Sequence, residues 1–137
     1  MKKLMLLFII CCLVTVAQSQ DAQFKVEVSI DSLLMGNYTE VTFTLENAKG
    51  SRFQAPDFEG FQVVGGPSQS SSFSMINGAV SQSQSYTYYL EPLEIGNFYI
   101  QPANIETDNG ILETEPVLVL VVPNPDGIEQ QATPRSR

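Results

Sequence analysis

Asn77-Gly78 constrains the fold of this chain more than any other feature, because this dipeptide is the strongest short-range signal for a β-hairpin. A two-residue type I′ turn needs positive φ at both central positions, which Asn and Gly adopt at little cost. The turn also sets the register, since Ile76 must lie opposite Ala79 and every later pair follows residue by residue. The sequence therefore predicts two antiparallel strands on either side of Asn77-Gly78.

The predicted hairpin lies within an uncharged run from Gly60 to Leu90, bounded by Glu59 and Glu91. Such a run stands out in a chain with 15 acidic and 7 basic residues. The base of the hairpin has Tyr and Leu side chains to bury, whereas its end is rich in Ser and Gln, which cannot fill a core. We therefore expect the end of the hairpin to project beyond the body of the domain.

We predict that this projecting end binds a protein. Ser and Gln offer hydrogen bonds without the desolvation cost of a charge, and apolar side chains offer anchors of the kind found at interface centres. The predicted protein-interaction residues are Phe73, Met75, Ile76 and Val80. An alternative stays open, because Ser-rich segments often form flexible loops that bind nothing.

Several other segments alternate apolar and polar residues, as expected of half-buried strands. The clearest are 24–30 and 41–45, and the second of these places Phe43 in the core. The unbroken apolar run from Val117 to Val122 predicts a strand that is buried on both faces. Pro116 cannot donate to a ladder, so this strand should begin at or beside a sheet edge.

Gly, Pro and Asn divide the chain into short strands, and no segment has a convincing helical period. Gly65-Gly66-Pro67 should separate a short strand at 62–64 from the hairpin, after an irregular stretch around Phe53 and Phe58. About seven such strands predict an all-β fold, an antiparallel immunoglobulin-like β-sandwich. The Cys…Trp…Cys core of immunoglobulin domains is absent, so the prediction concerns the architecture alone.

The amino-terminal residues have the three parts of a secretory signal peptide. Lys2 and Lys3 precede an apolar run over 4–17, which is shorter than the roughly 20 residues of a membrane span, and Ala17-Gln18-Ser19 supplies small residues for cleavage. The predicted organisation is a signal peptide at 1–19, a β-sandwich domain at 20–123 and a disordered tail at 124–137. The mature protein should be periplasmic or otherwise exported, soluble after cleavage and without a membrane span.

The chemistry of the mature chain is narrow, because residues 20–137 contain no His, Cys or Trp. Catalytic triads and the common His/Cys zinc sites are therefore excluded. The carboxylate pairs Asp57/Glu59 and Glu113/Glu115 fit a solvated surface, and no spaced Asp/Asn/Gly loop favours calcium. We expect no enzyme activity and no catalytic, cofactor-binding or metal-binding residues. An acidic chain also repels phosphate backbones, so nucleic acid is not an expected partner.

The order and spacing of several motifs resemble the first domain of the BatD (oxygen-tolerance, aerotolerance) family over residues 24–122. The matching residues are Phe53-x-x-Pro56-x-Phe58-x-Gly60-Phe61-x-Val63, Gly66-Pro67, Ser70-Ser71-Ser72, Asn77-Gly78, Ser85-Tyr86-x-Tyr88 and Leu90-x-Pro92-x-x-x-Gly96-x-Phe98-x-Ile100-x-Pro102-Ala103. The resemblance implies an exported bacterial protein of β-sandwich type. Family members usually have several such domains and a C-terminal membrane helix. One such domain is expected here. Their genes commonly lie beside those of von Willebrand factor A-type Bat proteins and a MoxR-type ATPase, so the former are implied as partners.

Two interpretations of function follow. The favoured one is an exported, non-enzymatic protein-interaction or scaffold domain of a bacterial envelope assembly of the Bat, aerotolerance type. The alternative is an extracytoplasmic carbohydrate- or ligand-binding module, in which exposed aromatic rings would stack on a ligand. The rings considered for such a platform are Phe73, Tyr86, Tyr88 and Tyr89. Alternating Tyr on a strand more often packs into a core, which disfavours the alternative.

Overall fold

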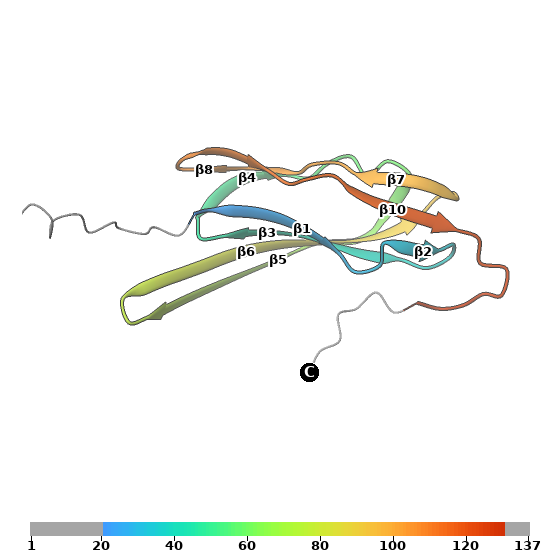
Figure 1. The fold of residues 1–137 in the computed structure, drawn as a ribbon, viewed down its shortest axis with the longest axis horizontal. Helices are drawn as coiled ribbons and strands as arrows, with labels where there is room; N and C mark the ends of the chain where they lie inside the picture. The colour runs from blue at the N-terminus through green and yellow to red at the C-terminus, as the bar shows by residue number, and fades with distance from the viewer. Residues whose placement is uncertain (1–20, 131–137) are drawn as a thin grey trace, which may run out of the picture.

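The structure is a computed structural model that describes residues 21–130, and strands are the only regular elements in this range. They form two layers that pack face to face (Figure 1). The first layer has the strand order β1-β3-β6-β5, and all neighbours in it run antiparallel. Its strands are β1 (Gln23–Val28), β3 (Thr39–Glu46), β5 (Phe61–Ile76) and β6 (Ala79–Pro92).

The second layer contains β2 (Ser32–Leu34), β4 (Gly50–Gln54), β7 (Gly96–Ile100), β8 (Asn104–Thr107), β9 (Gly110–Glu113) and β10 (Val117–Val122). The β8–β9 and β7–β10 ladders continue one long hairpin, because the residue numbers of opposed pairs add to the same total in both. Hydrogen bonds between Ala103 and Thr114 bridge the two ladders, at 3.0 Å from Thr114 N to Ala103 O and 2.9 Å from Ala103 N to Thr114 Oγ1. With β4 paired to β8 and β2 paired to β10, the layer has four strands side by side.

Strands β1 and β2 are successive parts of one strand that changes layer. β1 pairs with β3 in the first layer, and β2 then pairs with β10 in the second, in the one parallel ladder among residues 21–130. Counted in this way, the ten assigned segments make seven strands. The predicted all-β, immunoglobulin-like sandwich of about seven strands is therefore confirmed.

The core lies between the two layers and is centred on Phe43, whose complete burial confirms its prediction as a core residue. Aromatic rings surround it, with centroid distances of 5.7 Å to Phe53, 6.4 Å to Phe58 and 6.1 Å to Tyr88. Aliphatic side chains from both layers complete the cluster: Leu33, Val41, Leu90, Ile100, Val119 and Val121. Apolar burial of this kind is the main favourable term in folding a domain of this size.

The prediction for residues 117–122 was wrong. β10 is buried on one face only, because Val119 and Val121 point into the core whereas Leu118 and Leu120 are exposed. The physical reason is that the sandwich has two layers, so nothing among the described residues covers the outer face of the second layer. The expected edge beside Pro116 is present, since β2 pairs with β10 only from Leu120 onward.

The stretch that contains Phe53 was predicted to be irregular, but it forms strand β4. Arg52 has a positive φ of 54°, and the β4–β8 register shifts between Ser51 and Gln54, so the alternation that marks a strand is broken there. The chain is also continuous where a separation was expected. β5 runs from Phe61 through Gly65-Gly66-Pro67 to Ile76 as one strand, with register shifts at that point.

The first part of the predicted tail, residues 124–130, lies against the β2–β3 connection. Asn37 links the two segments, since its Nδ2 donates to Ile128 O at 2.8 Å and its Oδ1 accepts from Gln130 N at 2.8 Å. Gln130 Oε1 accepts a further bond from Leu34 N at 2.8 Å. The predicted signal peptide at 1–19 and the rest of the tail lie outside the described residues.

Candidate interaction surface on the β5–β6 hairpin

The β5–β6 hairpin has the register that Asn77-Gly78 predicts. Asn77 and Gly78 have φ values of 52° and 78°, as a type I′ turn requires. Ile76 lies opposite Ala79, and the pairing continues without a shift as far as Ser68 opposite Thr87. The expectation about the hairpin is therefore confirmed along its whole outer half.

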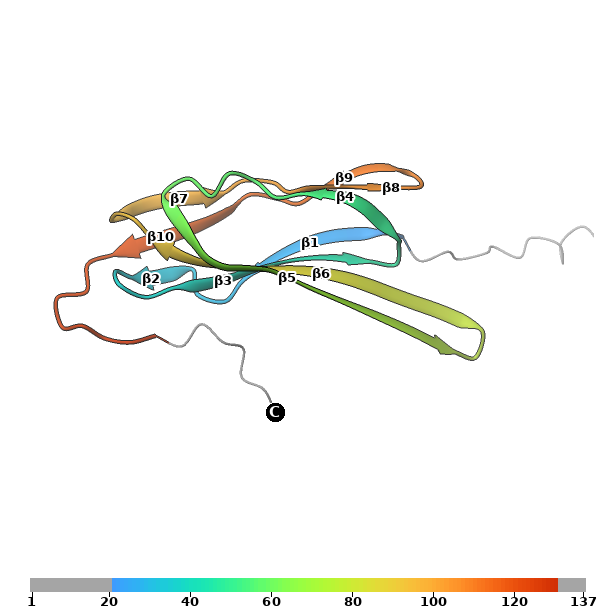
Figure 2. The ribbon, with the colours of Figure 1, turned by 180° about the vertical axis from the view of Figure 1, so that it is seen from behind.

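The end of the hairpin extends past the layer that supports it. β3 pairs with β6 up to Glu46 opposite Ser83, and one more bond follows, from Asn47 N to Gln82 O at 2.9 Å. Residues 73–82, here called the hairpin tip, project beyond β3, as both ribbon views show (Figures 1 and 2). All residues from 73 to 81 are exposed. The predicted projection from the domain is thus present.

The four predicted interaction residues all lie on the hairpin tip and are well exposed. Their exposed fractions are 66% for Phe73, 63% for Met75, 68% for Ile76 and 45% for Val80. The structure brings three of them together, because Met75 lies opposite Val80 and Phe73 is two residues from Met75 on the same face. Ile76 lies on the opposite face, beside the serines, so it does not join this group.

The opposite face of the hairpin is lined by serine pairs. Ser72 Oγ and Ser83 Oγ are 2.6 Å apart, and Ser74 Oγ and Ser81 Oγ are 2.8 Å apart, both at hydrogen-bond distance. Cross-strand hydroxyl pairs of this kind stabilise a ladder by roughly 0.2–1 kcal/mol each. The Ser74–Ser81 pair helps to keep the two strands together where β3 no longer supports them.

Closer to the body, the face that carries Phe73 becomes the core face of β6. Tyr86 stacks on Phe53 with ring centroids 4.0 Å apart and an interplanar angle of 2°. Tyr88 is buried, and this burial raises the pKa of Tyr88 above its usual value. The nearby Tyr86 makes a smaller contribution in the same direction. Gln84 Oε1 accepts a hydrogen bond from the backbone N–H of Gly50, the first residue of β4, at 2.8 Å.

This packing separates the rings that were considered as a sugar platform. Tyr86 and Tyr88 belong to the core. Tyr89 lies on the other face of β6, where its ring centroid is 6.0 Å from that of Tyr38. Phe73 is the exposed member of the set. These four rings therefore do not form a single surface on which a ligand could stack.

Sequence reasoning missed the feature that separates the hairpin tip from its base. Between Val63, opposite Leu90, and Ser68, opposite Thr87, β5 holds two more residues than β6, so it bulges. Gly66 has a φ of 93°, and a Cβ at this position would collide with the Thr87 carbonyl oxygen. The Gly65-Gly66-Pro67 signal was visible, but it predicted an end of the strand where the structure has a bulge.

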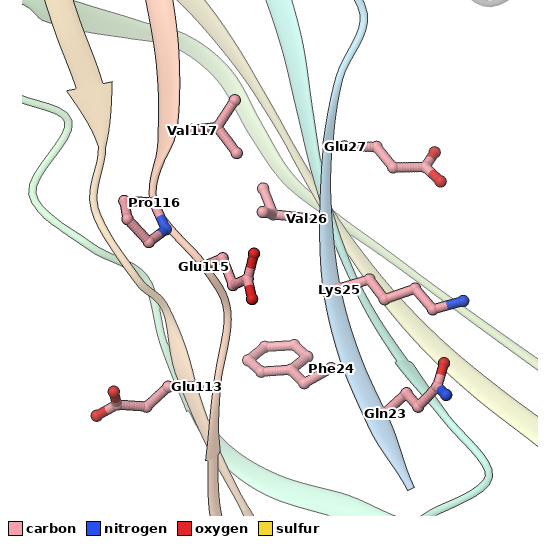
Figure 3. A pocket seen from close by; sticks show the side chains of 9 residues that line it. All are labelled: Gln23, Phe24, Lys25, Val26, Glu27, Glu113, Glu115, Pro116 and Val117. Atoms are coloured by element: carbon pink, nitrogen blue, oxygen red, sulfur yellow. The ribbon is translucent and has the colours of Figure 1, made fainter.

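A second feature is a cleft of about 510 Å³ at the side of the sandwich, between β1 and residues 113–117. Figure 3 shows Phe24 and Val26 projecting from β1 towards Glu115 and Val117. Lys25 and Glu27, the charged neighbours on β1, project away from it. The cleft is thus an apolar gap with one carboxylate facing into it.

The acidic pairs form no cluster of metal ligands. Within residues 21–130 there is no group of three or more His, Cys, Asp or Glu side chains placed to hold a metal ion. Asp57 and Glu59 are exposed on the β4–β5 connection, and Glu113 and Glu115 lie at the cleft. No helix in the same range has the length and apolar character needed to cross a membrane.

The fold and the projecting hairpin define the class as an immunoglobulin-like β-sandwich domain with one enlarged hairpin. The family model for the BatD DUF11-like domain matches residues 26–121, which is most of the chain. The protein therefore belongs to the BatD family, and the resemblance seen in its motifs is confirmed. No curated protein and no solved structure matches the chain.

Proposed function

We propose that this protein is an exported, non-enzymatic interaction domain of a Bat-type assembly in the bacterial envelope, and that the hairpin tip binds its protein partner. The observation that supports the proposal most is the exposure of Phe73, Met75 and Val80 on one face of a projecting, uncharged hairpin. A hairpin that only completed the sandwich would not need residues 73–82.

The chemistry of the tip suits a protein partner. Exposed aromatic and Met side chains are enriched at interface centres, where a few residues provide most of the binding energy. The surrounding Ser and Gln side chains can form hydrogen bonds at the rim without the cost of desolvating a charge. Membership of the BatD family supports von Willebrand factor A-type Bat proteins as the partners, and the sequence at 1–19 supports export to the periplasm.

Binding to the extracytoplasmic domain of such a Bat protein tests the proposal. We expect the double variant Phe73→Lys/Met75→Lys to bind at least about tenfold more weakly, because each anchor residue typically contributes more than 1 kcal/mol. The matched control is Leu93→Lys/Ile95→Lys, which also replaces two exposed apolar residues, 60% and 54% exposed, on the β6–β7 connection. The control should bind like the parent protein in biolayer interferometry.

Two outcomes would contradict the proposal. If the tip variant binds as tightly as the parent protein, the tip is not the interface. If both variants lose binding equally, the partner responds to added charge rather than to the tip. Circular dichroism melting of both variants checks that neither result comes from unfolding.

The alternative, a ligand-binding module, is supported by one observation, the cleft between β1 and residues 113–117. Phe24 and Val26 could pack against an apolar ligand there, and Glu115 could accept a hydrogen bond. A glycan and small-molecule array with the parent protein and with Val26→Asp tests it. A ligand that binds the parent and loses affinity for the variant would favour the module over the scaffold.

A further inference from the structure

The outer part of the free edge of β5, residues 68–76, has none of the features that usually prevent strand pairing between molecules. Within residues 21–130, β5 pairs with β6 alone, so its other edge exposes backbone N–H and C=O groups. Exposed edges are normally guarded by Lys, Glu, Pro or shortness. β5 spans 16 residues without a charge, and its one proline is Pro67. The unguarded part of the edge runs over residues 68–76.

We propose that this edge pairs with the same edge of a second copy, so that two molecules join their four-stranded layers into one sheet. The inference goes beyond the proposed function, because it concerns the backbone edge of β5 and a second copy of this chain. The partner-binding face of the hairpin tip is not needed for it. A closed two-fold dimer is the commonest way in which identical chains associate.

The hairpin geometry shows which backbone groups are free to pair. In a type I′ turn, Ile76 C=O accepts from Ala79 N–H, so Ile76 and Ala79 form a hydrogen-bonded pair. Hydrogen-bonded and non-hydrogen-bonded residues alternate along an antiparallel ladder. The even-numbered residues of β5 therefore bond to β6, and the odd-numbered residues 69, 71, 73 and 75 direct their backbone groups to the free edge.

The ends of the edge then select one register. Pro67 has no N–H, and Asn77 begins the turn, so pairing over the whole free length places Ser72 at the centre, opposite Ser72 of the second copy. The odd-numbered residues then oppose one another in hydrogen-bonded pairs, Ser71 with Phe73 and Gln69 with Met75. This gives about eight backbone hydrogen bonds between the two molecules.

The side chains are compatible in this register. On one face, serines oppose serines, since Ser70 meets Ser74 and Ser72 meets itself, next to the Ser72–Ser83 and Ser74–Ser81 pairs within each molecule. On the other face, the two Phe73 rings become diagonal neighbours at roughly 7–8 Å, within reach of aromatic side chains. No charge faces another charge anywhere along the interface.

Charge is what favours a second copy over another partner. All 15 acidic and 7 basic residues lie outside the run from Gly60 to Leu90, and the formal net charge is −8. A basic partner would bind better to the acidic remainder of the surface. A second copy is equally acidic, and it can approach the β5 edge without like-charge repulsion at the contact.

The other edge of the same layer explains why association would stop at two. β1 is only six residues long and carries Lys25 and Glu27, and Lys25 Nζ lies 3.1 Å from Glu46 Oε2 in a surface ion pair. Charged side chains on a short strand are the usual protection against edge pairing. One layer therefore has one guarded edge and one open edge, which permits a dimer but no chain of molecules.

A single cysteine tests the predicted register. In the full chain with Cys11→Ala and Cys12→Ala, Ser72→Cys should form a disulfide-linked dimer with oxidised glutathione as the oxidant, because a non-hydrogen-bonded pair has its Cα atoms about 4.5 Å apart. The matched control Ser74→Cys should stay largely monomeric, since the two Cys would be about 14 Å apart along the strands. Equal cross-linking of both variants, or of neither, would overturn the proposal.

A second measurement does not depend on cysteine. Sedimentation of the parent protein should give twice the mass of the chain, and Ser71→Pro should give the monomer, because it removes an N–H from the free edge and none from the β5–β6 ladder. Ser71→Ala keeps that N–H and should remain dimeric. A monomeric parent protein would refute the inference. Ser71→Pro retains Phe73 and Met75, so its binding to the Bat protein shows separately whether the proposed function holds.

Discussion

The two halves of the β5–β6 hairpin share two strands, one register and one alternation of faces, yet one half is core and the other is solvent-exposed surface. Tyr88 and Leu90, at the base, are buried in the core between the two layers. Phe73 and Val80, on the same face farther along, are exposed. The difference comes from the opposite layer, because Phe53 of β4 packs against Tyr86 and Tyr88 at the base, whereas Phe73 and Val80 remain exposed. The alternation of residues along a strand thus defines which face can be buried, and the facing layer decides which part of that face is buried.

The contrast predicts that substitutions at the base affect folding and substitutions at the tip affect recognition. The chain marks the transition with side chains that tolerate both environments. Gln84 and Gln82 follow Tyr86 on the same face and are half-buried, whereas Val80 is exposed. Moving outward along this face, aromatic packing gives way first to amide hydrogen bonding and then to free apolar side chains.

The largest effect should come from Phe43→Ala, at the centre of the core. Phe43 is fully buried and contacts three aromatic rings, so its loss should reduce the free energy of unfolding by about 3–5 kcal/mol. That is a large part of the roughly 5–15 kcal/mol that holds a typical domain folded. Urea denaturation followed by circular dichroism measures it, with Val80→Ala on the tip as the control. A loss as large for Val80→Ala would contradict the distinction between base and tip.

A smaller effect should come from the ionisation of Tyr88. Burial raises the pKa of Tyr88 above the ordinary value of 10.0, so below pH 10 the residue is neutral in both the folded and the unfolded protein. As the pH rises further, the unfolded protein releases the Tyr88 proton before the folded protein does. The free energy of unfolding therefore falls until the pH has passed the higher pKa of the folded state. Tyr88→Phe should therefore lose less stability than the parent protein as the pH rises above about 10. Urea titrations at several pH values measure this, and identical pH profiles would contradict it.

The sequence predicted the parts of the fold that depend on local signals. Asn77-Gly78 was sufficient for the hairpin and its register, and alternation was sufficient to place Phe43 in the core. It failed where the outcome depends on what lies opposite. The exposure of Leu118 could not be inferred from an apolar run, because only the layer arrangement shows that one face of β10 is uncovered. Strand β4 was missed for a similar reason. The irregular backbone at Arg52 breaks its alternation, and β4 is defined by its pairing with the distant strand β8.

The candidate site could be predicted in outline for the same reason. A run without charges, split by a two-residue turn, indicates an exposed hairpin end. Phe73, Met75 and Val80 share a face because side chains alternate along each strand and the turn places Met75 opposite Val80. The free edge of β5 and the guarded edge of β1 could not be inferred, because strand order depends on contacts between distant segments. The cleft beside β1 has the same origin, since its two walls are about 90 residues apart in the chain.

The smallest effect on stability should come from Phe73→Lys/Met75→Lys, the same double change that should weaken partner binding. Both side chains are more than 60% exposed, so little burial is lost, and surface substitutions usually change stability by no more than about 0.5 kcal/mol. The two lysines also reduce the net negative charge of the chain, which should not oppose folding. A thermal melt should therefore lie within about 2 °C of the parent protein. If the variant instead melts far lower, Phe73 and Met75 pack against the body in solution, and the hairpin tip is an extension of the core rather than a separate surface.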